Sequence, residues 1–511
     1  MTSPRNSALT HRWLYFFFLV GGCSAYLYAN LFTFSGTPYL FGGDQVFFWA
    51  DALRLMQGKR PYIDFFQFTT PGTDFFYLAL FRLFGARIWV TDLAILLCGC
   101  VLCLVCFALA SRIMERRDAL LATALFLVLD YGRILDATHH WFSLVAVIGA
   151  LGIILGGRTQ GRLAMCGLLL GIASFFTQTT GVAALIGISI ALLFDRTGPV
   201  KSNQHCPRLQ LILATSFAAT FGLLMTPFVW QAGWKQLWYM CVVYASHNVF
   251  YMEHFFSPVA ILDDLHRNRL IEVERLILLI AVTGIYIRLL WPDRNEGNES
   301  TGPNRPKVRI LALTGAMLLA TALIKPNWNR VYMALMPGII LLVWFCTRSR
   351  RIARSTRAVL WLTVALVGYR QLRFVHRQAR VALDMPGGRA ALADQRNVDE
   401  FAWLAHHTKP GDPLVQAATL NIFLPLELYD PLYVDGLWLK NTPPQFVESS
   451  IYQVEKYQVK YVIWKPQVVG PVAGTLSGED PLAAFRSYLL HHYVLVQTFA
   501  NGEEAWQRLP G

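Results

Sequence analysis

Charged residues are scarce in this chain of 511 residues, where they make up 15% of the sequence. Soluble domains usually carry about 25%. Apolar residues make up 55% and the mean hydropathy is +0.40. These values exclude a water-soluble globular protein. Because the long apolar runs end near residue 370, the chain divides into an apolar part, 1–370, and a more polar part, 371–511.

Cysteine is missing from the polar part, since all nine cysteines precede residue 370. No disulfide can therefore staple residues 371–511. Three of the nine, Cys100, Cys103 and Cys106, form a CxxCxxC pattern inside an apolar run that offers no fourth ligand. Cysteine in such a run usually acts as a small hydrophobe, and we expect no metal there.

A signal peptide is also not indicated, because the first apolar run, Trp13 to Phe34, is too long for a signal-peptide core and is not followed by a small-residue cleavage pattern. Crossing the hydrocarbon layer takes about 20 apolar residues, fewer where a helix ends inside protein. The sequence therefore predicts a mainly α, polytopic membrane protein with about eleven transmembrane helices. The predicted spans are 13–34, 88–110, 119–131, 141–157, 163–177, 180–194, 209–230, 274–291, 310–324, 331–346 and 358–370.

The net charge of +13 could indicate a nucleic-acid partner, but the Lys and Arg residues lie in alternate connections between the spans. They are denser on the side that includes the N terminus, which the positive-inside rule places in the cytoplasm. This predicts N terminus in and C terminus out, and no nucleic-acid partner. In a bacterium the protein would be a multi-pass protein of the inner (plasma) membrane, with its functional site on the extracytoplasmic side.

Residues 371–511 read as a small α/β domain on the outer face. Predicted helices and strands alternate, which suggests βαβ units: 397–407, 444–457 and 481–491 are helical, and 414–417, 461–464 and 493–499 are strands. We find no phosphate-binding glycine loop. A scaffold or acceptor-docking role and a catalytic role both stay open.

Two predicted outer loops, 35–87 and 231–273, are long, and long ordered loops tend to carry function. In the first, Asp44 stands where an N-cap would, before the apolar stretch 46–56, so its carboxylate could simply cap that helix. Asp51 follows two helical turns later, on the same face. Pro71-Gly72 predicts a turn, with Thr73 or Asp74 capping a second helix, 75–84. The two helices would lie along the membrane surface.

Four segments of this loop carry a family resemblance: Gly43-Asp44-Gln45, Trp49 to Leu53, Gly58 to Asp64, and Pro71-Gly72. They resemble the first external loop of the GT-C superfamily, which includes protein O-mannosyltransferases, the aminoarabinose transferase of lipid A and other polyprenyl-phosphate-sugar transferases. The resemblance covers residues 10–370 as a topology and 41–74 as a motif. It implies an inverting glycosyltransferase that moves a sugar from a polyprenyl-phosphate-sugar donor to an acceptor glycan, lipid or protein.

The same resemblance implies that Asp44 is the catalytic base, which takes the proton of the attacking acceptor hydroxyl. Many relatives have a second acidic residue directly after the first, where this chain has Gln45. A polyprenyl monophosphate leaving group does not demand a metal ion, so we expect neither a metal nor another cofactor. Asp51 and Asp64 are the candidate supporting residues within this loop.

A second polar segment, 130–141, follows the third predicted span. Clustered ionisable groups at a membrane boundary indicate a cavity, and the resemblance implies that this loop adds polar residues to the active site. Asp136 and His139 are the candidates, and the alternative is that they pair with one another at the interface. Zinc binding by His139-His140 is disfavoured, because adjacent histidines point in different directions and no third ligand follows at helical spacing.

Donor phosphate needs cationic side chains, and Arg suits bidentate contact. The candidates on the outer side are Lys59, Arg60, Arg133, Lys325 and Arg330. The segment from Lys325 to Arg330 is a short polar loop between two apolar spans that would dip toward the cavity. Ordinary interfacial anchoring by its Trp and Lys is the alternative.

Two other functions stay open at this point. A transporter or flippase would often show inverted repeats and charges at the membrane midplane, whereas this chain shows no repeat and its ionisable groups gather at the outer boundary. An inactive relative that scaffolds an envelope complex is the third hypothesis, which Gln45 leaves open. The expected partners are the lipid-linked donor, membrane lipid and an acceptor that the sequence does not identify.

Overall fold

A computed structural model of the chain describes residues 4–34, 36–194, 205–246, 258–291, 304–324, 328–348, 353–379, 381–393, 395–438, 442–473 and 480–510. The chain forms two compact units. Unit 1 comprises residues 1–30, 95–226 and 252–373, and unit 2 comprises residues 31–94, 227–251 and 374–511. The first predicted outer loop and the polar tail therefore belong to the same unit.

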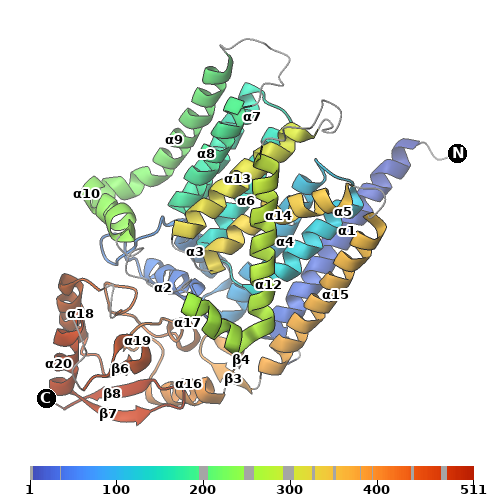
Figure 1. Cartoon of the computed structure of the whole chain (residues 1–511). Helices are drawn as coiled ribbons and strands as arrows, with labels where there is room; N and C mark the ends of the chain where they lie inside the picture. The colour runs from blue at the N-terminus through green and yellow to red at the C-terminus, as the bar shows by residue number, and fades with distance from the viewer. Residues whose placement is uncertain are drawn as a thin grey trace. The chain divides into compact units, whose positions relative to one another are not determined.

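Unit 1 is built of helices that lie side by side (Figure 1). Its helices are α1 Pro4–Leu31, α4 Ile88–Ala110, α5 Arg116–Leu129, α6 His139–Leu155, α7 Gln160–Phe176, α8 Gln178–Phe194, α9 His205–Ala232, α12 Pro258–Leu290, α13 Arg305–Ile324, α14 Trp328–Thr347 and α15 Ala353–Gln378, with a 3₁₀ turn, η1, at Tyr131–Arg133. The ends of α1, α4, α9 and α15 extend into residues assigned to unit 2.

Small residues let these helices approach one another closely. A Cβ atom placed on Gly167 of α7 would lie 2.4 Å from the backbone oxygen of Leu213 in α9. One on Gly171 would lie 2.9 Å from the backbone oxygen of Phe217. Glycines at such contacts are typical of helices that associate in a membrane.

Each of the eleven predicted spans falls on one of these helices, and the second, 88–110, coincides with α4. Within the described residues, five segments are long and apolar enough to cross a membrane: Ile88–Ala110, Pro207–Ala232, Arg305–Leu323, Arg330–Thr347 and Ala353–Gln378. Four apolar helices are shorter: Tyr15–Leu31, His139–Leu155, Gln160–Phe176 and Gln178–Leu193. The count of eleven crossings and their orientation stay predictions.

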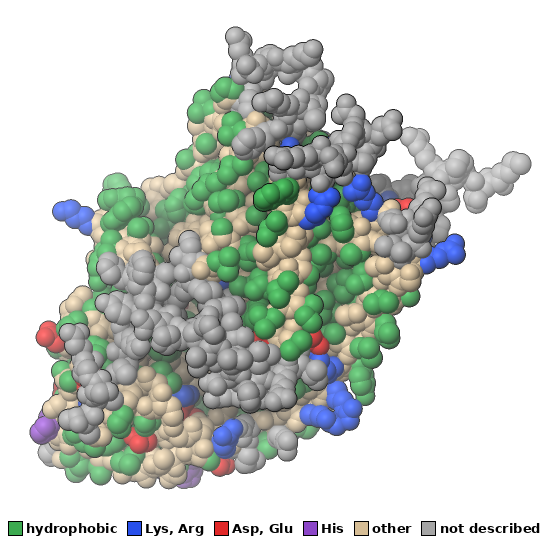
Figure 2. Space-filling model, viewed as in Figure 1, with side chains coloured by type: hydrophobic (Ala, Val, Ile, Leu, Met, Phe, Trp, Pro, Cys, Tyr) green, Lys and Arg blue, Asp and Glu red, His purple; other side chains and the backbone are tan. Residues whose placement is uncertain are grey.

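Large apolar side chains are exposed on the helices, as the space-filling view shows (Figure 2). Leu223 of α9 is 75% exposed and Ile280 of α12 is 69% exposed. Soluble monomers rarely expose broad apolar surface, and side chains of this kind are suited to contact with lipid.

Unit 2 contains the two helices predicted for the first loop, together with the tail. Its helices are α2 Gln45–Met56, α3 Gly72–Phe84, α10 Trp234–Trp238, the π-helix η2 Tyr239–Tyr244, α16 Gln395–His407, α17 Phe423–Leu426, α18 Pro444–Lys456, α19 Pro466–Val469 and α20 Ala483–His492. Its strands are β1 Phe32–Thr33, β2 Thr37–Pro38, β3 Val381–Met385, β4 Gly388–Leu392, β5 Leu414–Gln416, β6 Tyr461–Trp464, β7 Tyr493–Thr498 and β8 Glu504–Arg508.

The tail holds a four-stranded sheet in the order β5-β6-β8-β7. β5 and β6 are parallel, whereas β6-β8 and β8-β7 are antiparallel. The prediction of βαβ units is therefore right for β5 and β6 only, because β7 and β8 form a hairpin. Trp464 of β6 is fully buried, and its ring stacks on Phe485 of α20 at a centroid distance of 6.0 Å.

A second hairpin, β3–β4, joins the tail to the start of the first loop. The amide of Leu40 donates to the carbonyl of Ala391 in β4 at 2.9 Å. The amide of Ile88, at the end of the loop, donates to the carbonyl of Gly387 at 3.1 Å. Both ends of the first loop are thus hydrogen-bonded to the tail.

The range 231–273, predicted as a second long loop, contains α10, the π-helix and the first part of α12. The described part of this range is therefore mostly helical.

Candidate functional site

Asp44, the candidate base, lies at the start of α2 and is half-buried. Its backbone is already helical, with φ −64° and ψ −22°, and its side chain makes no capping hydrogen bond. A capping residue normally has extended backbone angles that aim its carboxylate at the amides of the first turn. Asp44 therefore stands at the N-cap position, as the sequence predicts, but the alternative in which its carboxylate caps the helix is wrong.

The neighbours of Asp44 fix the chain at this point. Gly43 has φ +85°, a conformation that L side chains rarely adopt. Gln45 is fully buried, and its Nε2 donates to the carbonyl of Gly42 at 3.3 Å. Its Oε1 atom has no hydrogen-bond partner among the described residues. The residue that stands in place of a second acid thus points inward rather than to solvent.

The cap expected for the second helix is also absent. α3 begins at Gly72 with Pro71 in the cap position and has no side-chain capping bond. Asp74 lies inside the first turn and accepts from Gln67 Nε2 at 2.8 Å. The same Nε2 donates to Asp51 at 3.0 Å. Gln67 thereby links α2 to α3.

Arg54 forms the centre of a buried charge cluster in unit 2. Its guanidinium pairs with Asp51 on α2 at 2.8 Å, with Asp430 at 2.7 Å and with Asp435. Arg54 Nη2 also donates to the backbone carbonyl of Val434 at 3.2 Å. The Arg54 side chain is 2% exposed. We call Arg54, Asp51, Asp430 and Asp435 the Arg54 cluster.

This cluster holds α2, the helix that begins beside Asp44, against the tail segment 430–435. Three carboxylates share one guanidinium, so the buried charges do not cancel. Burial and neighbouring carboxylates raise the pKa of Asp51, and burial raises the pKa of Asp430. Burial raises the pKa of Asp435 to about 6, against the lowering effect of Arg54. The cluster should therefore keep a proton on one carboxylate in mildly acidic solution.

A pH dependence of stability follows from Asp435. Its pKa rises from 3.8 when unfolded to about 6 when folded, so the folded chain holds the proton more tightly. The stability contributed by this group is complete below about pH 3.8 and is lost as the pH rises through about 6. Between pH 5 and pH 7.5, the thermal unfolding midpoint of the wild type should fall by a few degrees more than that of Asp435→Asn. Parallel slopes for the two proteins in scanning fluorimetry would contradict this.

The remaining candidates of the first loop lie nearer the surface. Arg60 and Asp64 pair with each other at 3.0 Å, with side chains 57% and 35% exposed. Lys59 Nζ donates to the backbone carbonyl of Asp430 at 3.0 Å and lies over the ring of Tyr429. Burial lowers the pKa of Lys59 to about 8, with the charge of Arg54 acting in the same direction. The ammonium is therefore still mostly charged at neutral pH.

The candidates on the second polar segment lie in unit 1. Asp136 is 7% exposed and accepts from Thr138 Oγ1 at 3.3 Å. The rings of His139 and His140 lie 3.9 Å apart, so the expectation that they point in different directions is wrong. The charge of Arg330 lies close enough to act on both rings. Within the described residues, no three His, Cys, Asp or Glu side chains are grouped to hold a metal ion.

The cationic candidates of unit 1 have different surroundings. Arg133 pairs with Glu274 and donates to Gln371 Oε1 at 3.0 Å. Glu274 also pairs with Arg370 of α15. Arg330 lies in the first turn of α14 and is partly exposed. Lys325 falls outside the described residues.

Sequence reasoning missed the Arg54 cluster and Glu274. Arg54 is the lone basic residue within the apolar stretch of α2, and a buried arginine needs acidic partners. The sequence therefore indicates that Arg54 has acidic partners, but it does not indicate which residues they are.

Comparison with known proteins identifies the fold of the chain. No family model matches the sequence, and no curated protein is similar to it. Among solved structures, ArnT from Cupriavidus metallidurans in the apo state aligns with a TM-score of 0.57 at 13% identity, over 98% of each chain. The Archaeoglobus fulgidus oligosaccharyltransferase, in complex with Zn and sulfate, aligns with a TM-score of 0.52 at 12% identity, over 87% of this chain and 67% of that one. Both are GT-C glycosyltransferases, so this chain has the GT-C fold.

Proposed function

We propose that this chain is a membrane glycosyltransferase that moves a sugar from a polyprenyl-phosphate-sugar donor to an acceptor on the outer face of the membrane. The GT-C fold supports this class of enzyme. The observation that carries the proposal within the chain is Asp44, whose half-buried carboxylate does not cap its own helix. The acceptor can be a glycan, a lipid or a protein.

In the proposed reaction, an acceptor hydroxyl oxygen attacks the anomeric carbon from the face opposite the phosphate. The new bond joins that oxygen to the anomeric carbon, and the bond from the anomeric carbon to the phosphate oxygen breaks. Asp44 takes the hydroxyl proton as general base, and the polyprenyl phosphate leaves as the anion. Attack from the opposite face inverts the anomeric configuration.

The other candidates receive roles that their surroundings support. Asp51 holds α2 through Arg54 rather than meeting substrate, since its side chain is 1% exposed. Lys59 and Arg60 are the cations of unit 2 proposed for the donor phosphate, because both are at least partly exposed. Asp64 orients Arg60 through their ion pair.

In unit 1, Asp136 and His139 are proposed as supporting residues and Arg133 and Arg330 as phosphate ligands. Lys325 is proposed for the same role on the sequence alone. We further propose a bacterial inner-membrane location with the site on the extracytoplasmic side, and donor and acceptor partners that are themselves membrane-associated.

The proposed function is tested by measuring whether the sugar of the donor becomes covalently attached to an acceptor. Membranes containing the protein are incubated with a panel of radiolabelled polyprenyl-phosphate-linked hexoses and pentoses and with total envelope material as acceptor. We expect the label to become covalently attached to an acceptor and unglycosylated polyprenyl phosphate to be released. In proteoliposomes of the pure protein, movement of the labelled lipid across the bilayer without any covalent product would replace the proposal with the transporter alternative.

A further inference from the structure

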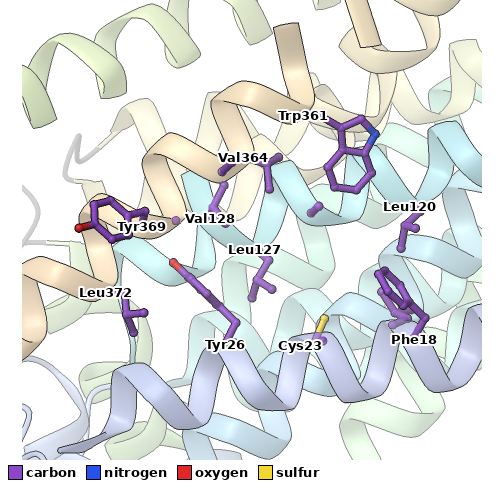
Figure 3. Close-up of a pocket in the computed structure, with 15 residues that line it drawn as sticks. Phe18, Cys23, Tyr26, Leu120, Leu127, Val128, Trp361, Val364, Tyr369 and Leu372 are labelled. Carbon is purple, nitrogen blue, oxygen red and sulfur yellow. The ribbon is translucent and has the colours of Figure 1, made fainter. Parts of the chain in front are cut away.

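Unit 1 contains an apolar groove between α1, α5 and α15, with a volume of about 480 Å³ (Figure 3). α1 contributes Phe18, Gly22 and Tyr26, among others, and α5 and α15 form the other walls. None of the lining residues is an acid, a base or a histidine. We call this space the α1–α5–α15 groove.

The length of the groove is close to the thickness of the hydrocarbon part of one membrane leaflet. Its wall on α15 runs from Trp361 to Leu372, which at 1.5 Å per helical residue is about 17 Å. Half of the ~30 Å hydrocarbon layer is about 15 Å. Phe18 and Tyr369, which both line the groove, are 68% and 64% exposed. The groove is therefore open at its side, where a bilayer chain could enter.

The two ends of the groove differ in charge. At the Phe18 and Trp361 end, α5 and α15 are joined by a neutral pair, Asp118 with Arg357, at 2.6 and 2.9 Å. At the other end, Glu274 is shared by two arginines, Arg133 and Arg370. That end carries a surplus positive charge.

The cationic end is next to the groove. A Cβ atom built on Gly132, the neighbour of Arg133, would lie 3.2 Å from the hydroxyl of Tyr26. Arg370 lies on α15 between the lining residues Tyr369 and Leu372, and its side chain is 34% exposed. Tyr26 and Tyr369 lie toward the same end in the close-up, away from Phe18 and Trp361 (Figure 3). The Tyr26 hydroxyl is buried without a hydrogen-bond partner in the described residues.

We propose that the α1–α5–α15 groove binds one acyl chain of an anionic glycerophospholipid, whose phosphate lies at the Arg370 end. The apolar walls bind the chain, the partly exposed guanidinium of Arg370 binds the phosphate, and the Tyr26 hydroxyl donates to an ester or phosphate oxygen. Because no acid, base or histidine lines the groove, the lipid is a resident ligand and not a reactant. This inference stands independently of the proposed glycosyl transfer.

Two adjacent glycines provide a matched test. Gly22 lines the groove and Gly21 does not, and a Cβ atom on either would meet nothing within 4 Å. The purified protein in nanodiscs receives phosphatidylglycerol with a diazirine on its acyl chain, and crosslinked peptides are identified by mass spectrometry. Gly22→Phe should lower crosslinking to α1 and α15 by tenfold or more, while Gly21→Phe leaves it at the wild-type level. Ala365→Phe, which fills the groove from α15, should act like Gly22→Phe even if the latter does not fold.

The head group is tested with the same probe. Arg370→Gln should reduce labelling by phosphatidylglycerol to the level given by a phosphatidylcholine analogue with the same chain. Equal labelling of Gly21→Phe and Gly22→Phe, together with unchanged labelling of Ala365→Phe, would overturn the groove as the binding site. Equal wild-type labelling by the two lipids would overturn the anionic head group. Displacement by polyprenyl phosphate but not by excess phosphatidylglycerol would assign the groove to the prenyl carrier and overturn the proposed occupant.

Discussion

Replacing Asp44 by Asn should lower the rate of sugar transfer by a factor of about 100 to 10,000, the usual contribution of a general base. Asn has nearly the same size and can keep the backbone of α2 in place, but it cannot accept the proton of the attacking hydroxyl. Since Asp44 makes no capping bond, the substitution removes no cap from the helix. The loss should fall on kcat rather than on KM, because proton transfer occurs in the transition state.

The control for this experiment is a carboxylate of the same unit that has no proposed role. Asp384 of β3 is 85% exposed and lies 3.9 Å from Arg389. Asp384→Asn should transfer sugar at the wild-type rate. Both variants are compared in membrane fractions at equal protein level, with the donor that the wild type accepts. Undiminished transfer by Asp44→Asn would remove Asp44 from the mechanism.

The helices of unit 1 could be predicted from the sequence because each depends on a local property, a continuous apolar run. Every predicted span falls on a helix, and the errors are at the ends, as for α12, which begins at Pro258 instead of near 274. Charged residues such as Arg267 and Arg269 interrupt the apolar signal there without interrupting the helix. A hydropathy run marks only the apolar part of a helix, whereas the helix itself continues into the polar residues on either side.

The hairpins of the tail were missed for a different reason. β3 reads Val-Ala-Leu-Asp-Met and β8 reads Glu-Ala-Trp-Gln-Arg, and both have little of the β-branched character that marks a strand. Pro386-Gly387 between β3 and β4 was a turn signal that could have been used.

In the candidate site, too, the residues marked by their local sequence could be predicted, whereas contacts between residues far apart in the sequence could not. Asp44 could be picked out because its position before α2 is visible in the sequence. The partners of Arg54, Asp430 and Asp435, are separated from it by 376 and 381 residues. No periodicity or motif connects positions so far apart. Only the structure shows that the first loop and the tail belong to one unit.

Replacing Arg54 by Met should destabilise unit 2 by about 3–5 kcal/mol, the usual effect of removing one partner from a buried ion pair. Met fills much of the same space, but Asp51, Asp430 and Asp435 would then face one another without a cation. The bonds to the carbonyls of Leu432 and Val434 would also be lost. Because α2 starts beside Asp44, sugar transfer should fall together with the thermal unfolding midpoint.

Arg60→Met is the matched control, because Arg60 lies in the same loop and pairs with Asp64 at the surface. Exposed pairs of this kind contribute little, so its unfolding midpoint should stay close to that of the wild type. Adding Asp430→Asn and Asp435→Asn to Arg54→Met should recover part of the lost stability, since two of the uncompensated carboxylates become neutral. If Arg54→Met melts at the wild-type temperature, or if the two Asn substitutions lower the midpoint further, charge pairing at Arg54 does not hold the first loop on the tail.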